Sequence, residues 1–483
     1  MNRFAQLDRK YVWHPFTQMR DWMRREPLVI VSGKGAVLRD VHKRKYLDAN
    51  SSIWTNLHGH NHAKINAAIS RQLKKIAHSS ALGLANEPAS LLAEKLVQAA
   101  NQQSRARERA VSVEQNPARF QAGPRLEKVF FSDDGSTALE VALKLAYEFS
   151  RRVKKQRKPK FLSLAGAYHG DTVGAVSLGH IDLFHKSWAG LLFNTDRAMA
   201  PYCYRCPFNR AKPERTDARE YRKCNWECVS KTERQFSSQK KKGKSYAAFV
   251  FEPLMQGAAG MIPQPAGWLN RVSEIARSHG ALLVADEVMT GFGRTGDNGA
   301  GLWFACQHEN VQPDFLCLAK GLTGGYLPMA ATLTTREVFD AFLGKYEEFK
   351  SFFHGHSYTG NQLGAAAALA NFGLLSKSNQ ERQKLENTLR RELQCLWQLP
   401  NVGDIRQVGL IAGIELVKNW RTREPFDLRE RAGIRVCEAM AARGVLTRPI
   451  GNVMVLMPPY CTTAVELKKI VSALRESIET IFK

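Results

Sequence analysis

The chain has 483 residues, of which 44% are hydrophobic and 24% charged, a composition that fits a folded globular protein and excludes a disordered or fibrous one. No stretch approaches the roughly 18 consecutive apolar residues of a membrane-spanning helix, and residues 1–10 lack the apolar core of a secretory signal. Nine cysteines, an odd number, argue against a disulfide framework. We therefore expect a cytoplasmic protein of more than one domain, with no membrane partner.

Most of the net charge of +25 lies in three polar stretches, at residues 101–128, 151–160 and 201–244. Two interpretations are open for them: solvated surface on insertions, or contact with nucleic acid. The basic residues are not interleaved with aromatic residues in an RNA-binding motif, and no basic recognition helix is visible. We therefore favour solvated surface and expect no specific nucleic-acid partner. A non-catalytic basic protein that binds nucleic acid is kept as a remote alternative.

Short apolar runs alternate with helical patterns along the rest of the chain. A helix is predicted after Ser132, with apolar residues at i, i+3, i+4, i+7, i+8 and i+11 from Ala138. A last helix is predicted from a capping box at Thr463 and Glu466. Alternating strands and helices favour a mainly parallel sheet. The runs predicted as buried strands are 128–132, 161–164, 247–252, 281–285 and 314–318.

The segment 130–137 (FFSDDGST) joins the first of these strands to its helix. Gly135 permits a tight turn there. The free backbone N–H groups of a helix N-terminus, together with the hydroxyl of Ser136, attract a phosphate group. Strand–glycine–helix junctions also occur merely as turns, so both interpretations stay open for this segment alone.

Two other strand ends carry charged groups. Asp286 and Glu287 follow the run 281–285, and Lys320 follows the run 314–318. Open α/β sheets bind ligands at the carboxyl ends of their strands, and a desolvated lysine has a lowered pKa that makes its amine a nucleophile. Taken singly, Asp286 could instead cap the following turn, and Lys320 could be solvated.

Taken together, the phosphate-binding turn, the strand-end aspartate and the strand-end lysine meet the needs of pyridoxal phosphate. Lys320 would form the Schiff base, and Asp286 would keep the pyridine nitrogen protonated. Gly135 and Ser136 would hold the phosphate. Tyr168, in the segment 166–170 (GAYHG), is placed to stack on the ring, with core packing as the alternative.

Further motifs run almost end to end through the chain, interrupted by the basic stretches. They are WHPFTQM (13–19), HGH (58–60), SDDGS (132–136), YHGDT (168–172), DEVMTGFGRTG (286–296), AKGLTGG (319–325), FHGHSYTGN (353–361) and RPIGNVMVLMPP (448–459). With these motifs the chain resembles the class III aminotransferases of fold type I. Within that class it is most similar to the branch that makes 7,8-diaminononanoate from 8-amino-7-oxononanoate in biotin biosynthesis. Another ω-amino-acid transaminase or an aminomutase of the same class is the alternative.

The resemblance implies an α/β fold with a large domain, residues 61–345, built on a mainly parallel sheet. A small α/β domain would come from both termini, residues 1–60 and 346–483. It also implies a homodimer with active sites at the interface, where His356 and Ser357 reach the phosphate of the other subunit.

The resemblance also implies roles for single residues. Lys320, Asp286 and Tyr168 would be catalytic, and Arg448 would bind the carboxylate of the long acyl substrate, a bidentate task that suits a guanidinium. The other residues expected to shape the substrate pocket are Phe16, Ile53, Trp54, Arg294 and Gly355.

Two departures from the family pattern concern the amino donor. Members that use S-adenosylmethionine usually carry Tyr where this chain has Phe16, and a Trp-Trp pair where it has Ile53 and Trp54. The missing phenol and indole are surfaces that an adenine ring could use. A branch of the family uses lysine as donor, so we weigh lysine and S-adenosylmethionine about evenly, with a slight preference for lysine.

Four cysteines in the third basic stretch form a pattern of their own. Cys203, Cys206, Cys224 and Cys228 give C-x2-C and C-x3-C, a spacing similar to that of a structural zinc site. A zinc ion would order a loop too polar to fold alone, whereas the alternative is four reduced cysteines without metal.

Overall fold

A computed structural model describes residues 1–102, 124–296 and 301–483. The N-terminal part runs through α1 (Arg3–Tyr11), α2 (Met19–Trp22), β1 (Ile30–Lys34), β2 (Val37–Asp40), β3 (Lys45–Asp48), α3 (Ser51–Trp54), α4 (Ala63–Lys75) and α5 (Glu87–Ala100). The middle part begins with β4 (Leu126–Ser132), α7 (Gly135–Arg152), β5 (Lys160–Leu164), α8 (Val173–Ser177), α9 (Asp182–His185), η2 (Lys186–Leu191) and β6 (Asp196–Ala198).

The middle part continues through η3 (Cys203–Arg205), α10 (Ala218–Tyr221), α11 (Glu227–Lys241), β7 (Tyr246–Phe251), β8 (Met255–Gln256), β9 (Ile262–Pro263), α12 (Trp268–Ser278), β10 (Leu282–Asp286), η4 (Ala305–Glu309), β11 (Phe315–Leu318), η5 (Lys320–Thr323), β12 (Ala330–Thr335), α13 (Arg336–Asp340) and η6 (Tyr346–Glu348). The C-terminal part holds α14 (Gln362–Leu375), α15 (Asn379–Leu393), η7 (Gln394–Gln398), β13 (Val402–Val408), β14 (Ile411–Asn419), β15 (Glu424–Pro425), η8 (Leu428–Glu430), α16 (Ala432–Ala442), β16 (Val445–Leu446), β17 (Pro449–Ile450), β18 (Val453–Leu456) and α17 (Ala464–Ile481).

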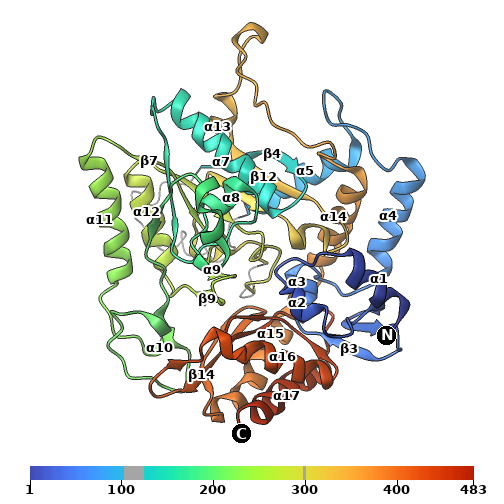
Figure 1. Cartoon of the computed structure of the whole chain (residues 1–483). Coiled ribbons are helices and arrows are strands. Elements are labelled where there is room, and N and C mark those ends of the chain that lie inside the picture. The colour runs from blue at the N-terminus through green and yellow to red at the C-terminus, as the bar shows by residue number, and fades with distance from the viewer. Residues whose placement is uncertain (103–123, 297–300) are drawn as a thin grey trace.

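The largest sheet has seven strands in the order β4-β12-β11-β10-β7-β5-β6. β12 pairs antiparallel with both β11 and β4, and the other neighbours pair in parallel. Helices lie on both faces of this sheet (Figure 1). The predicted α/β class with a mainly parallel sheet is confirmed, because buried strands and covering helices alternate along the chain.

Helix α7 shows why the predicted pattern folds as it does. The side chain of Asp134 accepts the N–H of Thr137, and the side chain of Thr137 accepts the N–H of Asp134, so a capping box starts the helix. The predicted apolar face is buried against the sheet along its full length, from Ala138 to Phe149. The helix therefore presents its N-terminus at the end of β4, where a phosphate site is expected.

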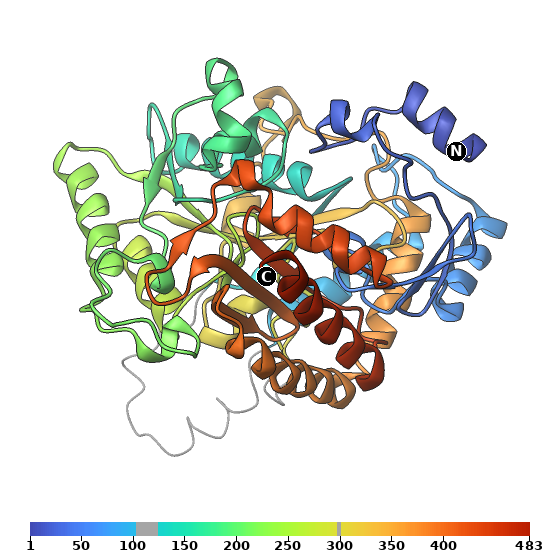
Figure 2. The ribbon, with the colours of Figure 1, turned by 60° about the horizontal axis from the view of Figure 1, so that its bottom comes forward.

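Strands from both ends of the chain meet in one of the smaller sheets. β16 pairs in parallel with β3, so an N-terminal strand and a C-terminal strand share the sheet β1-β2-β3-β16. The five-stranded sheet, with β13, β14, β18 and β17 in order, lies beside α15, α16 and α17 (Figure 2). The capping box predicted for the last helix is present at Thr463 and Glu466. The domain boundaries at residues 60 and 345 stay a prediction.

The basic stretch 201–244 is only partly solvated. Arg205 donates to Glu415 at 2.6 Å, Arg215 donates to the carbonyl oxygen of Val402 at 2.6 Å, and Arg219 donates to that of Gln407 at 2.8 Å. These arginines therefore attach the stretch to the C-terminal sheet, which corrects the expectation of solvated surface for them. The lysines at 240–244 are exposed, as expected. Most of the stretch 101–128 lies outside the described residues.

The zinc prediction is not supported by the structure. Among the described residues, which include all four cysteines, no group of three or more Cys, His, Asp or Glu is arranged to hold a metal ion. The thiols are used in packing instead: Cys203 donates to the carbonyl oxygen of Pro201, and Cys228 belongs to the large apolar core. Within the same described residues, no helix is both long and apolar enough to span a bilayer.

Candidate active site

Three neighbouring strands of the large sheet end at charged residues. β7 and β10 pair with Ala285 opposite Phe251, so Glu252 and Asp286 follow at the same edge. β10 and β11 pair with Asp286 opposite Cys317, and Lys320 comes three residues later. The parallel register thus collects a glutamate, an aspartate and a lysine at the carboxyl edge of the sheet, where the sequence predicted the site.

Asp286 is buried and held by two donors. Its Oδ2 lies 2.7 Å from His169 Nδ1, and its Oδ1 accepts the N–H of Val288 at 3.1 Å. Burial alone would lower the pKa of His169, but the hydrogen bond and charge of Asp286 outweigh it and raise that pKa. The contact with Asp286 therefore shifts the pKa of His169 toward its protonated form. Glu287 points elsewhere and accepts the N–H groups of Ala305 and Cys306.

Lys320 lies beneath an aromatic ring. Its Nζ is 4.6 Å from the ring centroid of Trp54, and no hydrogen bond from Nζ is found among the described residues. Burial lowers the pKa of Lys320, and the charges of Asp286 and Glu252 offset this effect only in part. The amine is thus desolvated rather than solvated at a strand end, which decides between the two interpretations that the sequence left open.

The start of α7 forms a cradle beside this edge. The backbone N–H groups of Gly135 and Ser136 donate to no protein acceptor among the described residues, whereas the N–H of Thr137 donates to the Asp134 side chain. The Oγ of Ser136 accepts the N–H of Asp171 at 3.2 Å. A Cβ on Gly170 would lie 2.1 Å from that Oγ, so glycine is required for this close approach. Two free N–H groups and a hydroxyl therefore face one place.

Aromatic rings surround the entrance to the site. The ring centroid of Phe16 lies 6.5 Å from that of Tyr168 and 5.3 Å from that of Phe184, and the rings meet edge to face. The hydroxyl of Tyr168 donates to Asp171 at 2.7 Å. Arg448 is exposed and donates to the carbonyl oxygen of Phe16 at 3.1 Å. The structure thus brings Phe16, Tyr168 and Arg448 close together, and their role in binding substrate stays a prediction.

Arg294 is bound to backbone from two distant segments. Its side chain is buried, with Nη1 donating to the carbonyl oxygen of Pro458 at 2.8 Å and Nη2 to that of Asn56 at 2.9 Å. Both terminal nitrogens are therefore engaged with backbone, and Arg294 joins the chain segments that carry Asn56 and Pro458. Its expected part in shaping the substrate pocket stays a prediction.

The remaining predicted residues lie at the rim. Ile53 is 45% exposed beside Trp54, and Gly355 is exposed with open space around its Cα. His356 Nδ1 lies 3.2 Å from Asp133 Oδ2 of its own chain. The structure contains one chain, so the prediction that His356 and Ser357 reach the partner subunit stays a prediction.

Sequence reasoning missed three residues of this site. His169 and Glu252 meet Asp286 only through the register of the sheet, and Phe184 reaches Phe16 from the short helix α9. Glu252 is buried and accepts the N–H groups of Tyr168 and Gly257, while burial raises its pKa to about 7. The signal that could have found Glu252 was its place as the charged last residue of the predicted strand 247–252.

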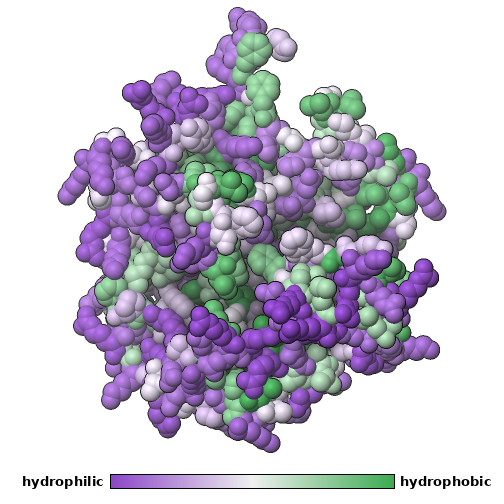
Figure 3. Space-filling model, viewed as in Figure 1, coloured by the Kyte–Doolittle hydropathy of each residue, from purple (hydrophilic) through white to green (hydrophobic). Residues whose placement is uncertain are grey.

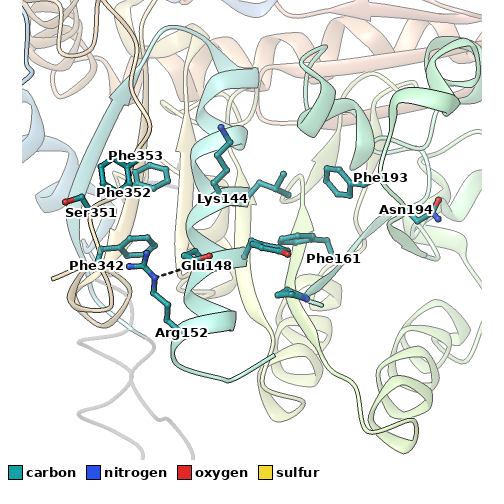
Figure 4. A pocket seen from close by; sticks show the side chains of 13 residues that line it. Lys144, Glu148, Arg152, Phe161, Phe193, Asn194, Phe342, Ser351, Phe352 and Phe353 are labelled. Carbon is teal, nitrogen blue, oxygen red and sulfur yellow. Dashed lines mark hydrogen bonds and ion pairs between the residues drawn. The ribbon is translucent and has the colours of Figure 1, made fainter. Parts of the chain in front are cut away.

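A hollow lies between the C-terminal part and the rest of the molecule, with hydrophobic surface inside it (Figure 3). A separate cavity of 520 Å3 lies on the outer side of α7, where the rings of Phe161, Phe193 and Phe342 approach Lys144 and the Glu148–Arg152 ion pair (Figure 4). None of the candidate site residues lines that cavity. The chemistry therefore belongs to the edge of the sheet and not to this cavity.

The residues present fit pyridoxal phosphate. The Gly135 and Ser136 N–H groups suit its phosphate, the carboxyl group of Asp286 suits a pyridinium nitrogen, and the desolvated amine of Lys320 suits its aldehyde.

Comparison with known proteins gives the family. The model of the class III aminotransferase family matches residues 19–478. The adenosylmethionine-8-amino-7-oxononanoate aminotransferase of Geobacter sulfurreducens is 46% identical over 477 residues, which cover 98% of this chain and 97% of that protein. The crystal structure of the protein of that name from Methanocaldococcus jannaschii has a TM-score of 0.85 at 39% identity and covers 99% of this chain and 98% of its own.

A second solved structure, an amine transaminase from an uncultivated Pseudomonas species in its PLP-bound form, has a TM-score of 0.83 at 31% identity and covers 97% of this chain and 98% of its own. The chain belongs to the class III aminotransferase family. It is a pyridoxal-phosphate-dependent enzyme of fold type I, and its relatives from several organisms share the name adenosylmethionine-8-amino-7-oxononanoate aminotransferase.

Proposed function

We propose that this enzyme transfers an amino group to 8-amino-7-oxononanoate and forms 7,8-diaminononanoate, a step of biotin biosynthesis. The observation that supports this choice of substrate is that Arg448 lies next to the aromatic rings at the entrance to the site. Arg448 can bind the carboxylate of the acceptor, and the rings of Phe16 and Phe184 offer apolar surface to its methylene chain. The shared name of relatives 46% to 41% identical over the full chain supports the same substrate.

The roles of the chain's own residues follow from the geometry. Bound pyridoxal phosphate supplies an aldehyde carbon that exchanges amino groups and a ring that accepts electrons. Lys320 would hold the cofactor through its amine and would move a proton on and off the substrate carbon, a role that suits an amine whose pKa is lowered by burial. Asp286 would face the ring nitrogen and stabilise positive charge there. Trp54 covers the amine and excludes water from it.

We propose in addition a homodimer in the cytoplasm. Several large apolar side chains on two loops are left exposed, including Leu82 at 92%, Tyr346 at 88% and Phe353 at 78%. His78 Nε2 lies 2.9 Å from the carbonyl oxygen of Ser357, so the two loops form one surface. A second copy would cover these side chains and bring its own His356 and Ser357 toward the first phosphate site.

The acceptor is tested by turnover with each candidate in turn. We expect 8-amino-7-oxononanoate to react with a kcat/KM at least about 100-fold above pyruvate and 2-oxoglutarate, because neither small acid spans from Lys320 to Arg448. Arg448→Ala should raise the KM for this acceptor about 10-fold or more, since a charge-assisted pair is worth about 1.5–3 kcal/mol. Faster turnover of either simple keto acid would reject the proposal.

The amino donor is tested separately, in the first half-reaction. We expect both lysine and S-adenosylmethionine to convert the loaded enzyme to its pyridoxamine phosphate form, with lysine the slightly better donor because Phe16 and Ile53 lack the phenol and the indole. Rapid mixing with each donor alone, followed by absorbance, gives the two rates. Conversion by S-adenosylmethionine only would end the case for lysine.

A further inference from the structure

The segment between β3 and α4 contains an unusual stretch of backbone. Ser51, Ser52, Ile53 and Trp54 have φ angles of 47°, 48°, 62° and 70°. All four are in the left-handed region, which disfavours residues with a Cβ, and left-handed residues other than glycine normally occur singly. α3 is therefore a left-handed turn of four non-glycine residues. Strain of this kind persists only where the surroundings over-determine it.

The buried carboxylate of Asp48 makes several of the hydrogen bonds that hold this turn in place. Its Oδ1 accepts the N–H groups of Asn50 at 3.2 Å and Ser52 at 3.1 Å, and its Oδ2 accepts the hydroxyl of Ser52 at 3.1 Å. The same Oδ2 lies 2.9 Å from His60 Nε2. Burial alone would raise the pKa of Asp48, but the bonds from His60 and Ser52 outweigh it and lower that pKa. The group that holds the turn is therefore ionised.

Both ends of the turn are fixed to the rest of the fold. At its start, the hydroxyl of Ser51 donates to the carbonyl oxygen of Met457 at 2.6 Å. Trp54 then packs against the buried cluster that contains Met255, Met261 and Met289. In this position its ring centroid lies 4.6 Å from Lys320 Nζ. A right-handed or extended course of residues 51–54 would carry the indole in another direction, because four backbone torsions would change together.

We propose that Asp48 is a positioning residue for the transamination reaction, which holds the left-handed turn Ser51–Trp54 so that the Trp54 indole covers the Lys320 amine. Asp48 does not contact Lys320 in this structure, and its effect passes through the turn. The inference rests on the proposed role of Lys320 in holding the cofactor, which the Lys320→Ala variant tests on its own.

The test uses glycine to separate the turn from general stability. Asp48→Ala removes all four contacts, and we expect half-reactions about 10- to 100-fold slower, mainly in kcat, because a displacement of about 1 Å can cost that much. Adding Ser52→Gly should recover at least about 3-fold, because glycine adopts positive φ without a Cβ clash. Adding Thr55→Gly is the matched control, since Thr55 has a φ of −91°, and it should recover nothing.

A second readout reports the cover over Lys320 without turnover. Hydroxylamine removes pyridoxal phosphate from the loaded enzyme, and we expect Asp48→Ala to speed this release while Ser52→Gly in that background slows it again. Asp48→Asn, which keeps one acceptor oxygen, should lie between the two and serves where the alanine variant does not fold. The proposal would be overturned if Asp48→Asn and Asp48→Ala released the cofactor and turned over at wild-type rates. It would also be overturned if Thr55→Gly restored the rate as well as Ser52→Gly does. Loss of covalent cofactor attachment in Lys320→Ala, together with an Asp48→Ala variant that behaves as wild type, would reject the role of Asp48 alone.

Discussion

Replacement of Lys320 by alanine is expected to abolish both half-reactions. Proton transfer by a positioned side chain contributes about 10²–10⁴-fold, and the variant also loses the amine that holds the cofactor. We therefore expect kcat to fall by roughly 10⁴-fold or more. Single-turnover absorbance with donor and with acceptor measures the two half-reactions separately. The cofactor should still bind through Gly135 and Ser136, but sodium borohydride should no longer attach it covalently.

The controls for this variant follow from the position of the side chain. Lys320 lies beneath Trp54, so alanine leaves unfilled space there, and the thermal midpoint should fall by a few degrees rather than collapse. Lys345→Ala, on an exposed residue outside the site, should keep wild-type rates and covalent attachment. Appreciable turnover of Lys320→Ala without added amine would remove Lys320 from its role.

Much of this site could be predicted from the sequence because its residues follow strands. The runs before Asp286 and Lys320 are apolar and short, and the segment before Gly135 leads into a helix with clear periodicity. Parallel strands that end at one edge place such residues together without further information. The α/β class and the start of α7 follow from the same patterns, which are local in the chain.

The parts that could not be predicted depend on contacts distant in sequence. The bond between His169 and Asp286 joins residues 117 positions apart. Nothing in the run Ser51-Ser-Ile-Trp54 indicates a left-handed turn, because none of the four residues prefers positive φ. Arg294 lies in a motif that suggests a place in the substrate pocket, yet its terminal nitrogens donate to the carbonyl oxygens of Asn56 and Pro458. Burial and partner choice decide these cases, and a single sequence contains neither.

Replacement of Asp286 by asparagine is expected to cause the second large loss of activity. The substitution keeps the size of the side chain and the bond to Val288 N–H, but it removes the negative charge that faces the cofactor ring. A preorganised electrostatic contact of this kind is worth about 10²–10³-fold in kcat. Asp286 also raises the pKa of His169, so that pKa should fall in the variant, and the buried histidine should become neutral.

The matched control for Asp286→Asn is Glu287→Gln, one residue along the same strand end. Glu287 is buried too, but its oxygens accept the N–H groups of Ala305 and Cys306 rather than facing the site. Its substitution should lower the thermal midpoint, because a buried N–H loses its acceptor, while leaving the absorbance of the bound cofactor and its pH dependence unchanged. Asp286→Asn should show the reverse, with a small change in stability and a large change in absorbance and in kcat. If both variants lose activity only in proportion to their loss of stability, the charge of Asp286 has no direct role in the reaction. Asp286 would then lie near Lys320 at this sheet edge only because of how the fold packs.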